Sequence, residues 1–254
     1  MTTPAKFVKA LEFGAPKTGK TKNTVETCPK PALIFSFEAG GTDCVTAIPI
    51  TGMTSGDFRA KMVAKSKDWP AVTVLEYLPG AKRIGEGKTE TFDKSRLEAF
   101  IKDFNLLFDH MPFRTVIADS FTGMDTVSMA FILGLNKADT AQIQHYGQLQ
   151  TKKEAIISAL MSLPCNVVVL AHEEAQKDEL TGAIRILPFG TGKFQEKMGM
   201  YFSQVVYRTV STDTQGNPKY EVWTAPRGLV KGLGLRFPQG KKPVVGPTWK
   251  DIYE

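Results

Sequence analysis

The sequence predicts an α/β fold in which helices flank a mostly parallel central sheet and a β-hairpin lies near the C-terminus. Apolar, strand-like runs alternate with segments of helical spacing, and the clearest runs lie at residues 32–37, 114–120 and 166–172. A glycine-rich turn near the start also separates a short strand from a helix. With 254 residues, the chain is long enough for one large domain with a well-buried core.

The glycine-rich turn reads FGAPKTGKT over residues 13–21, and its G-x-x-x-x-G-K-T spacing is that of a phosphate-binding loop. Backbone N–H groups of such a loop surround a phosphate, and the following helix adds its positive end. Lys20 would bring its charge to the β- and γ-phosphates, while the Thr21 hydroxyl would bind Mg²⁺. The residues expected to contact the nucleotide are Gly14, Ala15, Pro16, Lys17, Thr18, Gly19, Lys20 and Thr21.

The context of the loop supports this interpretation. Residues 7–11 are predicted to form a strand that enters the loop, and residues 22–27 continue as a helix. The alternative is a basic surface turn without a ligand. Because a strand, a loop and a helix follow one another in the order that a phosphate site requires, the nucleotide site is favoured.

Three predicted strands end in residues that carry chemistry. Residues 32–37 lead into Glu38, residues 114–118 into Asp119, and residues 166–171 into His172. Open parallel sheets bind their ligands at the carboxyl ends of the strands, so a functional Glu38 is favoured over a solvated turn acid. Asp119 is predicted to bind the Mg²⁺ of a nucleotide. A lone histidine is commonly structural, but the position of His172 favours a hydrogen bond to the γ-phosphate or its attacking water.

The remaining elements follow from periodicity. The apolar spacing of residues 94–109 predicts a helix whose aromatic side chains face the core. Residues 173–191 are expected to form a long mixed loop, and two alternating runs are expected to form a β-hairpin. The other predicted elements are strand 71–75, helices 57–67, 121–135 and 143–163, and the two hairpin strands 203–211 and 220–224.

Residues 1–224 are expected to form the core, followed by a basic, glycine- and proline-rich tail over residues 225–254. From residue 225 to residue 250 there are six basic residues and no acidic one, so this segment either contacts phosphates or is simply solvated. Residues 79–91 form a second basic stretch with the same two interpretations. The net charge of +6 is compatible with a polyanionic partner, but many basic enzymes bind no nucleic acid.

Composition sets further limits. No apolar run is long enough to cross a bilayer, and the N-terminus lacks an apolar signal core. The three cysteines, Cys28, Cys44 and Cys165, lack metal-ligand spacing, and their odd number argues against a disulfide framework. We therefore expect a cytoplasmic protein.

Taken together, the loop and the three strand ends resemble the RecA-like core ATPases. The similarity is to the phage-encoded group that includes Sak-type single-strand annealing and recombination proteins. It rests on residues 14–21, 35–41, 116–120 and 168–173. The resemblance implies that Glu38 activates the hydrolytic water, that Asp119 holds Mg²⁺, and that His172 senses the γ-phosphate. RecA itself carries glutamine at the last position, so the histidine is a departure.

The resemblance also implies ATP and Mg²⁺ as cofactors, single-stranded DNA as a partner, and a homo-oligomeric ring or filament. RecA-like proteins use a basic residue of the neighbouring subunit, for which Lys193, Arg227 and Lys231 are candidates. The expected function is ATP hydrolysis on single-stranded DNA in phage recombination or replication, within the host cytoplasm. The alternatives are a P-loop ATPase of another class, such as a helicase loader or motor subunit, and a nucleotide-dependent binding module without turnover.

Overall fold

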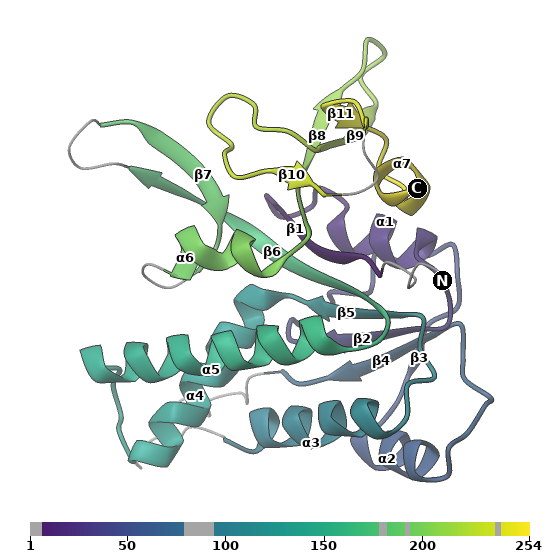
Figure 1. Cartoon of the computed structure of the whole chain (residues 1–254), viewed down its shortest axis with the longest axis vertical. Helices are drawn as coiled ribbons and strands as arrows, with labels where there is room; N and C mark the ends of the chain where they lie inside the picture. Colours follow the sequence, from purple (N-terminus) through teal and green to yellow (C-terminus); the bar gives the residue numbers. More distant parts are fainter. Residues whose placement is uncertain (1–6, 79–93, 178–181, 191–193, 237–239) are drawn as a thin grey trace, which may run out of the picture.

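The computed structural model describes residues 7–78, 94–177, 182–190, 194–236 and 240–254, and it has the α/β architecture that the sequence predicts (Figure 1). Within these ranges the strands form one mixed, mostly parallel sheet in the order β11-β9-β8-β1-β6-β5-β2-β4-β3, with β10 paired to β8 and β7 paired to β6. The strands are β1 (Lys9–Gly14), β2 (Ala32–Ser36), β3 (Thr51–Gly52), β4 (Val72–Glu76), β5 (Thr115–Asp119), β6 (Asn166–Lys177), β7 (Ile184–Pro188), β8 (Gln204–Thr212), β9 (Pro218–Trp223), β10 (Gly234–Leu235) and β11 (Val244–Val245).

Helices cover both faces of this sheet. Helices α2 to α5 lie on one face, and α1 and α7 lie on the other (Figure 1). The helices are α1 (Lys20–Thr27), α2 (Ser55–Val63), α3 (Ser95–Asp109), α4 (Phe121–Asn136), α5 (Ile143–Ser162), α6 (Phe194–Lys197), followed by a 3₁₀ turn (Met198–Tyr201), and α7 (Trp249–Tyr253).

The strand sequences account for this two-sided core. Along β2, Leu33 and Phe35 pack toward the helices of one face, whereas Ala32 and Ile34 pack toward the other. Successive side chains of a strand point to opposite faces, so a strand that is buried on both faces reads as a continuous apolar run. That is why the inner strands could be recognised in the sequence.

The aromatic residues of α3 are buried only in part. The Phe100 ring packs edge-on against Phe35, with 5.1 Å between the ring centroids, and Phe104 also lies in the core. Phe108 at the end of the helix is half-exposed instead, because the last turn extends past the sheet-facing stripe.

The expectation of a long loop over residues 173–191 was wrong. Strand β6 continues past His172 to Lys177 and pairs with β7 in an antiparallel hairpin that extends away from the rest of the sheet (Figure 1). Charged residues interrupt the apolar run after His172, which hides this part of β6 from a periodicity argument, although backbone hydrogen bonds pair it with β7. The predicted hairpin of β8 and β9 is confirmed.

Part of the segment after residue 224 is packed against the core. Strands β10 and β11 extend the sheet, and α7 lies against α1 with Trp249, Ile252 and Tyr253 buried. Thr248 and Asp251 cap α7 reciprocally, which fixes the start of this short helix. The boundary at residue 224 stays a prediction. No helix among the described residues is long and apolar enough to span a bilayer.

Candidate functional site

The phosphate loop occupies residues 14–19, between the carboxyl end of β1 and the first turn of α1. Gly19 lies at the N-cap of α1 with a φ angle of 77°, which is in the left-handed region that glycine tolerates best. Gly14 meets a different constraint: a Cβ built there would lie 2.2 Å from the carbonyl oxygen of Arg208 on β8. Both glycines of the motif are therefore required by the geometry of the loop.

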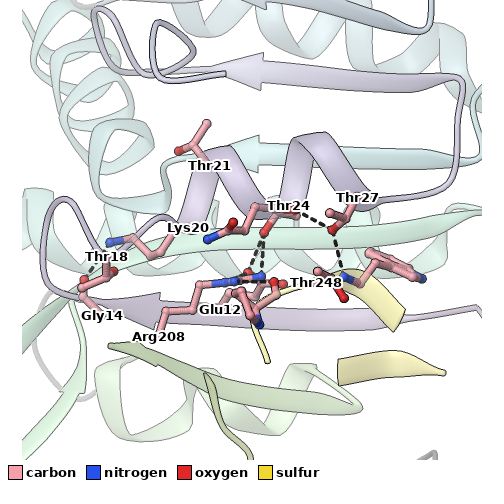
Figure 2. Close-up of polar contacts among 12 residues, drawn as sticks. Glu12, Gly14, Thr18, Lys20, Thr21, Thr24, Thr27, Arg208 and Thr248 are labelled. Atoms are coloured by element: carbon pink, nitrogen blue, oxygen red, sulfur yellow. Dashed lines mark hydrogen bonds and ion pairs between the residues drawn. The ribbon is translucent and has the colours of Figure 1, made fainter. Parts of the chain in front are cut away.

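Lys20 bends back over this loop. Its Nζ donates hydrogen bonds to the carbonyl oxygens of Gly14 and Ala15, each at 2.8 Å (Figure 2). Burial lowers the pKa of Lys20 to about 8, against the opposing influence of the nearby carboxylates Asp119 and Glu38. The lysine charge therefore lies within the loop and close to both acids.

Strand register brings the other predicted residues to the same edge of the sheet. In the parallel ladders, Gly14 lies opposite His172, and Ser36 lies opposite Asp119. Because β1, β6, β5 and β2 are adjacent, the ends of their parallel ladders form one continuous row, in which His172 lies within β6. Glu38 follows β2 two residues after Ser36, so the strand register brings Glu38, Asp119 and His172 to the same edge as the loop.

Asp119 and Thr21 form one contact of this site. The Thr21 hydroxyl donates to Asp119 Oδ2 at 2.7 Å. Burial raises the pKa of Asp119 to about 6, although the hydrogen bond from Thr21 acts in the opposite direction. A hydroxyl and a carboxylate are hard oxygen ligands, and Mg²⁺ commonly takes one or two such protein ligands together with substrate phosphates. These two residues therefore suit the Mg²⁺ of a nucleotide.

Glu38 is held in place by two hydrogen-bonding partners. Its Oε1 accepts from the Ser120 hydroxyl and lies 3.0 Å from His172 Nε2. Burial alone would raise the pKa of Glu38, but the hydrogen bonds from His172 and Ser120 outweigh it, so the pKa lies below its ordinary value. The Glu38 side chain is 31% exposed. An ionised, oriented and partly open carboxylate is suited to activate water.

Four further residues belong to this environment. Ser120 caps α4 through its contact with the Gly123 N–H, in addition to its bond to Glu38. Thr122 accepts a hydrogen bond from the His172 main chain at 3.2 Å, and Tyr207 donates to Glu173 at 2.6 Å. Ser120 and Thr122 lie one and three residues after Asp119, so their closeness to that strand end could have indicated them, although neither was predicted as a site residue. No local pattern marks Tyr207, which comes from β8.

The basic residues considered for a neighbouring subunit's site fall in different places. Arg227 and Lys231 are exposed in the segment between β9 and β10. The Arg227 guanidinium lies 5.1 Å from the centre of the Trp223 ring. Lys193 lies outside the described residues, as does the basic stretch over residues 79–91. A role in trans for any of them stays a prediction.

A family model described as an AAA domain matches residues 6–230. No curated protein matches the chain. Because the family match covers most of the sequence, the chain belongs to the AAA domain family of P-loop ATPases. Membership in this family supports nucleotide binding at the loop described above.

Gly14→Ala tests the geometry of the loop. The added methyl would overlap the Arg208 carbonyl oxygen, so either the loop or β8 must shift. We expect ATP affinity to fall by about tenfold or more, because the loop N–H groups would no longer converge on the phosphates. Isothermal titration calorimetry measures the change. Gly147→Ala is the control, since a Cβ there meets nothing within 4 Å; equal affinities in both variants would contradict the prediction.

Asp119→Asn tests the cost of burying a charge at the site. The folded-state pKa of Asp119 is raised, so ionisation of its carboxyl group lowers the free energy of unfolding. This loss of stability is absent below about pH 4, increases as the pH rises to about 6, and is complete above about pH 6. Without nucleotide or Mg²⁺, we expect the variant to be more stable than the wild type by at most about 3 kcal/mol at pH 8, and the gain to vanish in acid. Urea unfolding across this pH range measures it.

Asp103→Asn is the matched control for that experiment. Asp103 is equally buried, but it is paired with Arg59 and accepts a hydrogen bond from Tyr77 at 2.7 Å. Its replacement should lower the free energy of unfolding, because it leaves a charged partner without its counter-ion. Loss of stability in both variants would contradict the assignment of Asp119 as an unfavourably buried carboxylate.

Proposed function

We propose that this member of the AAA domain family binds ATP with Mg²⁺ and hydrolyses it at the phosphate loop. One observation carries the proposal: four residues from separate segments of the chain meet around one loop, where the parallel ladders of adjacent strands end. These residues are Lys20, Glu38, Asp119 and His172. Family membership independently supports nucleotide binding.

The mechanism assigns a role to each group. The N–H groups of the loop and the Lys20 ammonium bind the β- and γ-phosphates and stabilise the charge that spreads over the γ-phosphoryl oxygens in the transition state. Thr21 and Asp119 would hold Mg²⁺, which supplies further charge neutralisation when it is bound. Glu38 orients the attacking water and accepts its proton. Ser120 keeps the Glu38 carboxylate in position through their hydrogen bond.

His172 is assigned to the γ-phosphate. Its Nε2 lies next to Glu38, and its backbone is fixed by the Thr122 hydroxyl and by the ladder between β6 and β1. A donor at this point can exchange its contact with Glu38 for one with the phosphate. Through this exchange of hydrogen bonds, the presence of the γ-phosphate would affect strand β6, which carries His172.

We further propose that the ATPase acts on single-stranded DNA, as a homo-oligomeric ring or filament, in phage recombination or replication within the host cytoplasm. Two features support this: the resemblance to the Sak-type RecA-like group, and the exposed basic residues after residue 224, among them Lys231 and Lys242. Phosphate contacts of such residues bind nucleic acid without regard to sequence. Helicase loading or another motor function is the competing assignment.

Glu38→Gln tests the catalytic assignment. The amide keeps the size of the side chain but cannot accept the proton of water, so we expect kcat for ATP hydrolysis to fall by about a hundredfold or more with ATP affinity nearly unchanged. Phosphate release and equilibrium nucleotide binding measure the two quantities. Lys20→Ala is the contrasting variant, in which binding itself should be lost. Wild-type turnover in Glu38→Gln would assign the base to another residue.

Turnover with and without single-stranded DNA tests the partner. We expect stimulation of several-fold that weakens as salt increases, because counterion release drives phosphate binding. Replacing Lys231 and Lys242 with alanine should reduce the stimulation, whereas the same change at the exposed Lys65 and Lys67, which follow α2, should not. A basal ATP turnover that does not change when DNA is added would favour a motor of another class. The absence of ATP turnover would favour a binding module.

A further inference from the structure

A buried polar cluster lies between α1, β1 and β8, on the side of α1 from which Thr21 points away (Figure 2). We call Glu12, Thr24, Arg208 and Tyr253 the Glu12 cluster. Glu12 lies on β1, two residues before Gly14, and is fully buried. Its Oε2 accepts hydrogen bonds from the Thr24 hydroxyl at 2.7 Å and from Arg208 Nε, and its Oε1 accepts one from the Tyr253 hydroxyl at 2.8 Å.

Arg208 is the second charged member of the Glu12 cluster, and it is 1% exposed. Besides its ion pair with Glu12, its guanidinium donates to the Pro247 carbonyl at 2.9 Å and to the Thr24 hydroxyl at 3.1 Å. Figure 2 shows Thr24 pointing from α1 toward Glu12 and Arg208, while Thr21 points away from them. The cluster therefore ties α1 to β1, to β8 and to the chain just before α7.

The Glu12 cluster is connected to the phosphate loop through the main chain. The Arg208 carbonyl oxygen lies against Gly14, so the position of Arg208 on β8 limits where the loop can begin. Thr24 lies one turn after Lys20 and Thr21 on α1, so the position of Thr24 limits where the loop ends. A further bond from the Trp249 N–H to the Thr27 hydroxyl, at 2.8 Å, joins α7 to the other end of α1.

The polar chemistry of the Glu12 cluster indicates that it fixes the orientation of the elements around it. A buried ion pair is often no more stable than apolar side chains of the same volume, because both charges must be removed from water. Val25, Val206 and Ile252 belong to the apolar core on this face of the sheet, so further apolar side chains could have taken the positions of the cluster. Its hydrogen bonds, unlike apolar contacts, fix the relative orientation of the two elements that form the loop.

We propose that Glu12, Arg208 and Tyr253 are positioning residues for the phosphate loop, and that the C-terminal helix takes part in nucleotide binding through Tyr253. They hold the end of β1 and the first turn of α1 at the separation that a bound triphosphate requires. None of the three touches the nucleotide. The inference rests on the proposed function, because it concerns the same loop.

The structure offers a matched control for this proposal. On the opposite face of the sheet, Tyr77, Asp103 and Arg59 form a second cluster of tyrosine, carboxylate and arginine. Tyr77 donates to Asp103 at 2.7 Å, and both residues are buried. Tyr253→Phe and Tyr77→Phe thus each remove one buried hydrogen bond to a carboxylate, but only Tyr253 belongs to the cluster that contacts the loop.

The experiment compares these variants in the 254-residue chain. We expect both to lower the melting temperature by similar amounts, whereas only Tyr253→Phe raises the KM and the Kd for ATP, by about tenfold, with kcat changed by less than about twofold. Arg208→Lys, which keeps the charge but loses the directed bonds, should raise KM and Kd in the same way, and Arg59→Lys should not. All assays are run below the melting temperature of the least stable variant.

Each outcome has a defined meaning. If wild-type protein binds no ATP, the proposed function fails and this inference falls with it. If wild-type protein binds ATP but Tyr253→Phe and Arg208→Lys keep wild-type KM and Kd values, the Glu12 cluster is merely structural and this inference alone is overturned. Equal increases in KM in the Tyr253→Phe and Tyr77→Phe variants would likewise overturn it, since they would show a general response to lost stability.

Discussion

The register of four neighbouring parallel strands is the constraint on which the rest of the structure depends. The ladders between β1 and β6, between β6 and β5, and between β5 and β2 set which residues end side by side. A slip of one residue in any of them would turn every side chain of that strand to the opposite face. Asp119 would then no longer face Thr21, and His172 would no longer face Glu38. The apolar side chains on both faces of the sheet prevent such a slip, so core packing and site geometry are enforced by the same residues.

The site itself is unfavourable for the stability of the fold. Lys20 and Asp119 are both buried, and burial shifts the pKa of each toward its uncharged form. The pKa of Glu38 is lowered instead, because its hydrogen bonds with Ser120 and His172 favour the charged form. Charges placed at such a cost are typical of positions where a charged ligand completes the electrostatics. The buried Glu12 cluster differs, because its carboxylate is satisfied entirely by groups of the chain.

Much of the fold and of the candidate site could be predicted because the signals are local. Residues 13–21 carry their own spacing, and the strands that lead to Glu38, Asp119 and His172 are continuous apolar runs. The β6–β7 hairpin was missed because residues 173–177 of β6 are mostly charged or polar and continue a strand past the end of its apolar run. The Glu12 cluster was missed for another reason: Arg208 and Tyr253 lie 196 and 241 residues from Glu12 in the sequence. A buried carboxylate cannot be matched with so distant a partner without the sheet order that brings them together.

This sequence separation has a consequence for how the protein is made. Ribosomes add about 5–20 residues per second, so Glu12 waits on the order of tens of seconds for Tyr253 to be synthesised. Until then the nascent chain can pair β1 with its inner neighbours, but the carboxylate lacks its tyrosine partner. Long-range contacts of this kind form late in folding because the chain entropy of closing the loop must be overcome first. The nucleotide-binding loop would then be among the last parts of the molecule to mature, after most of the sheet is already in place.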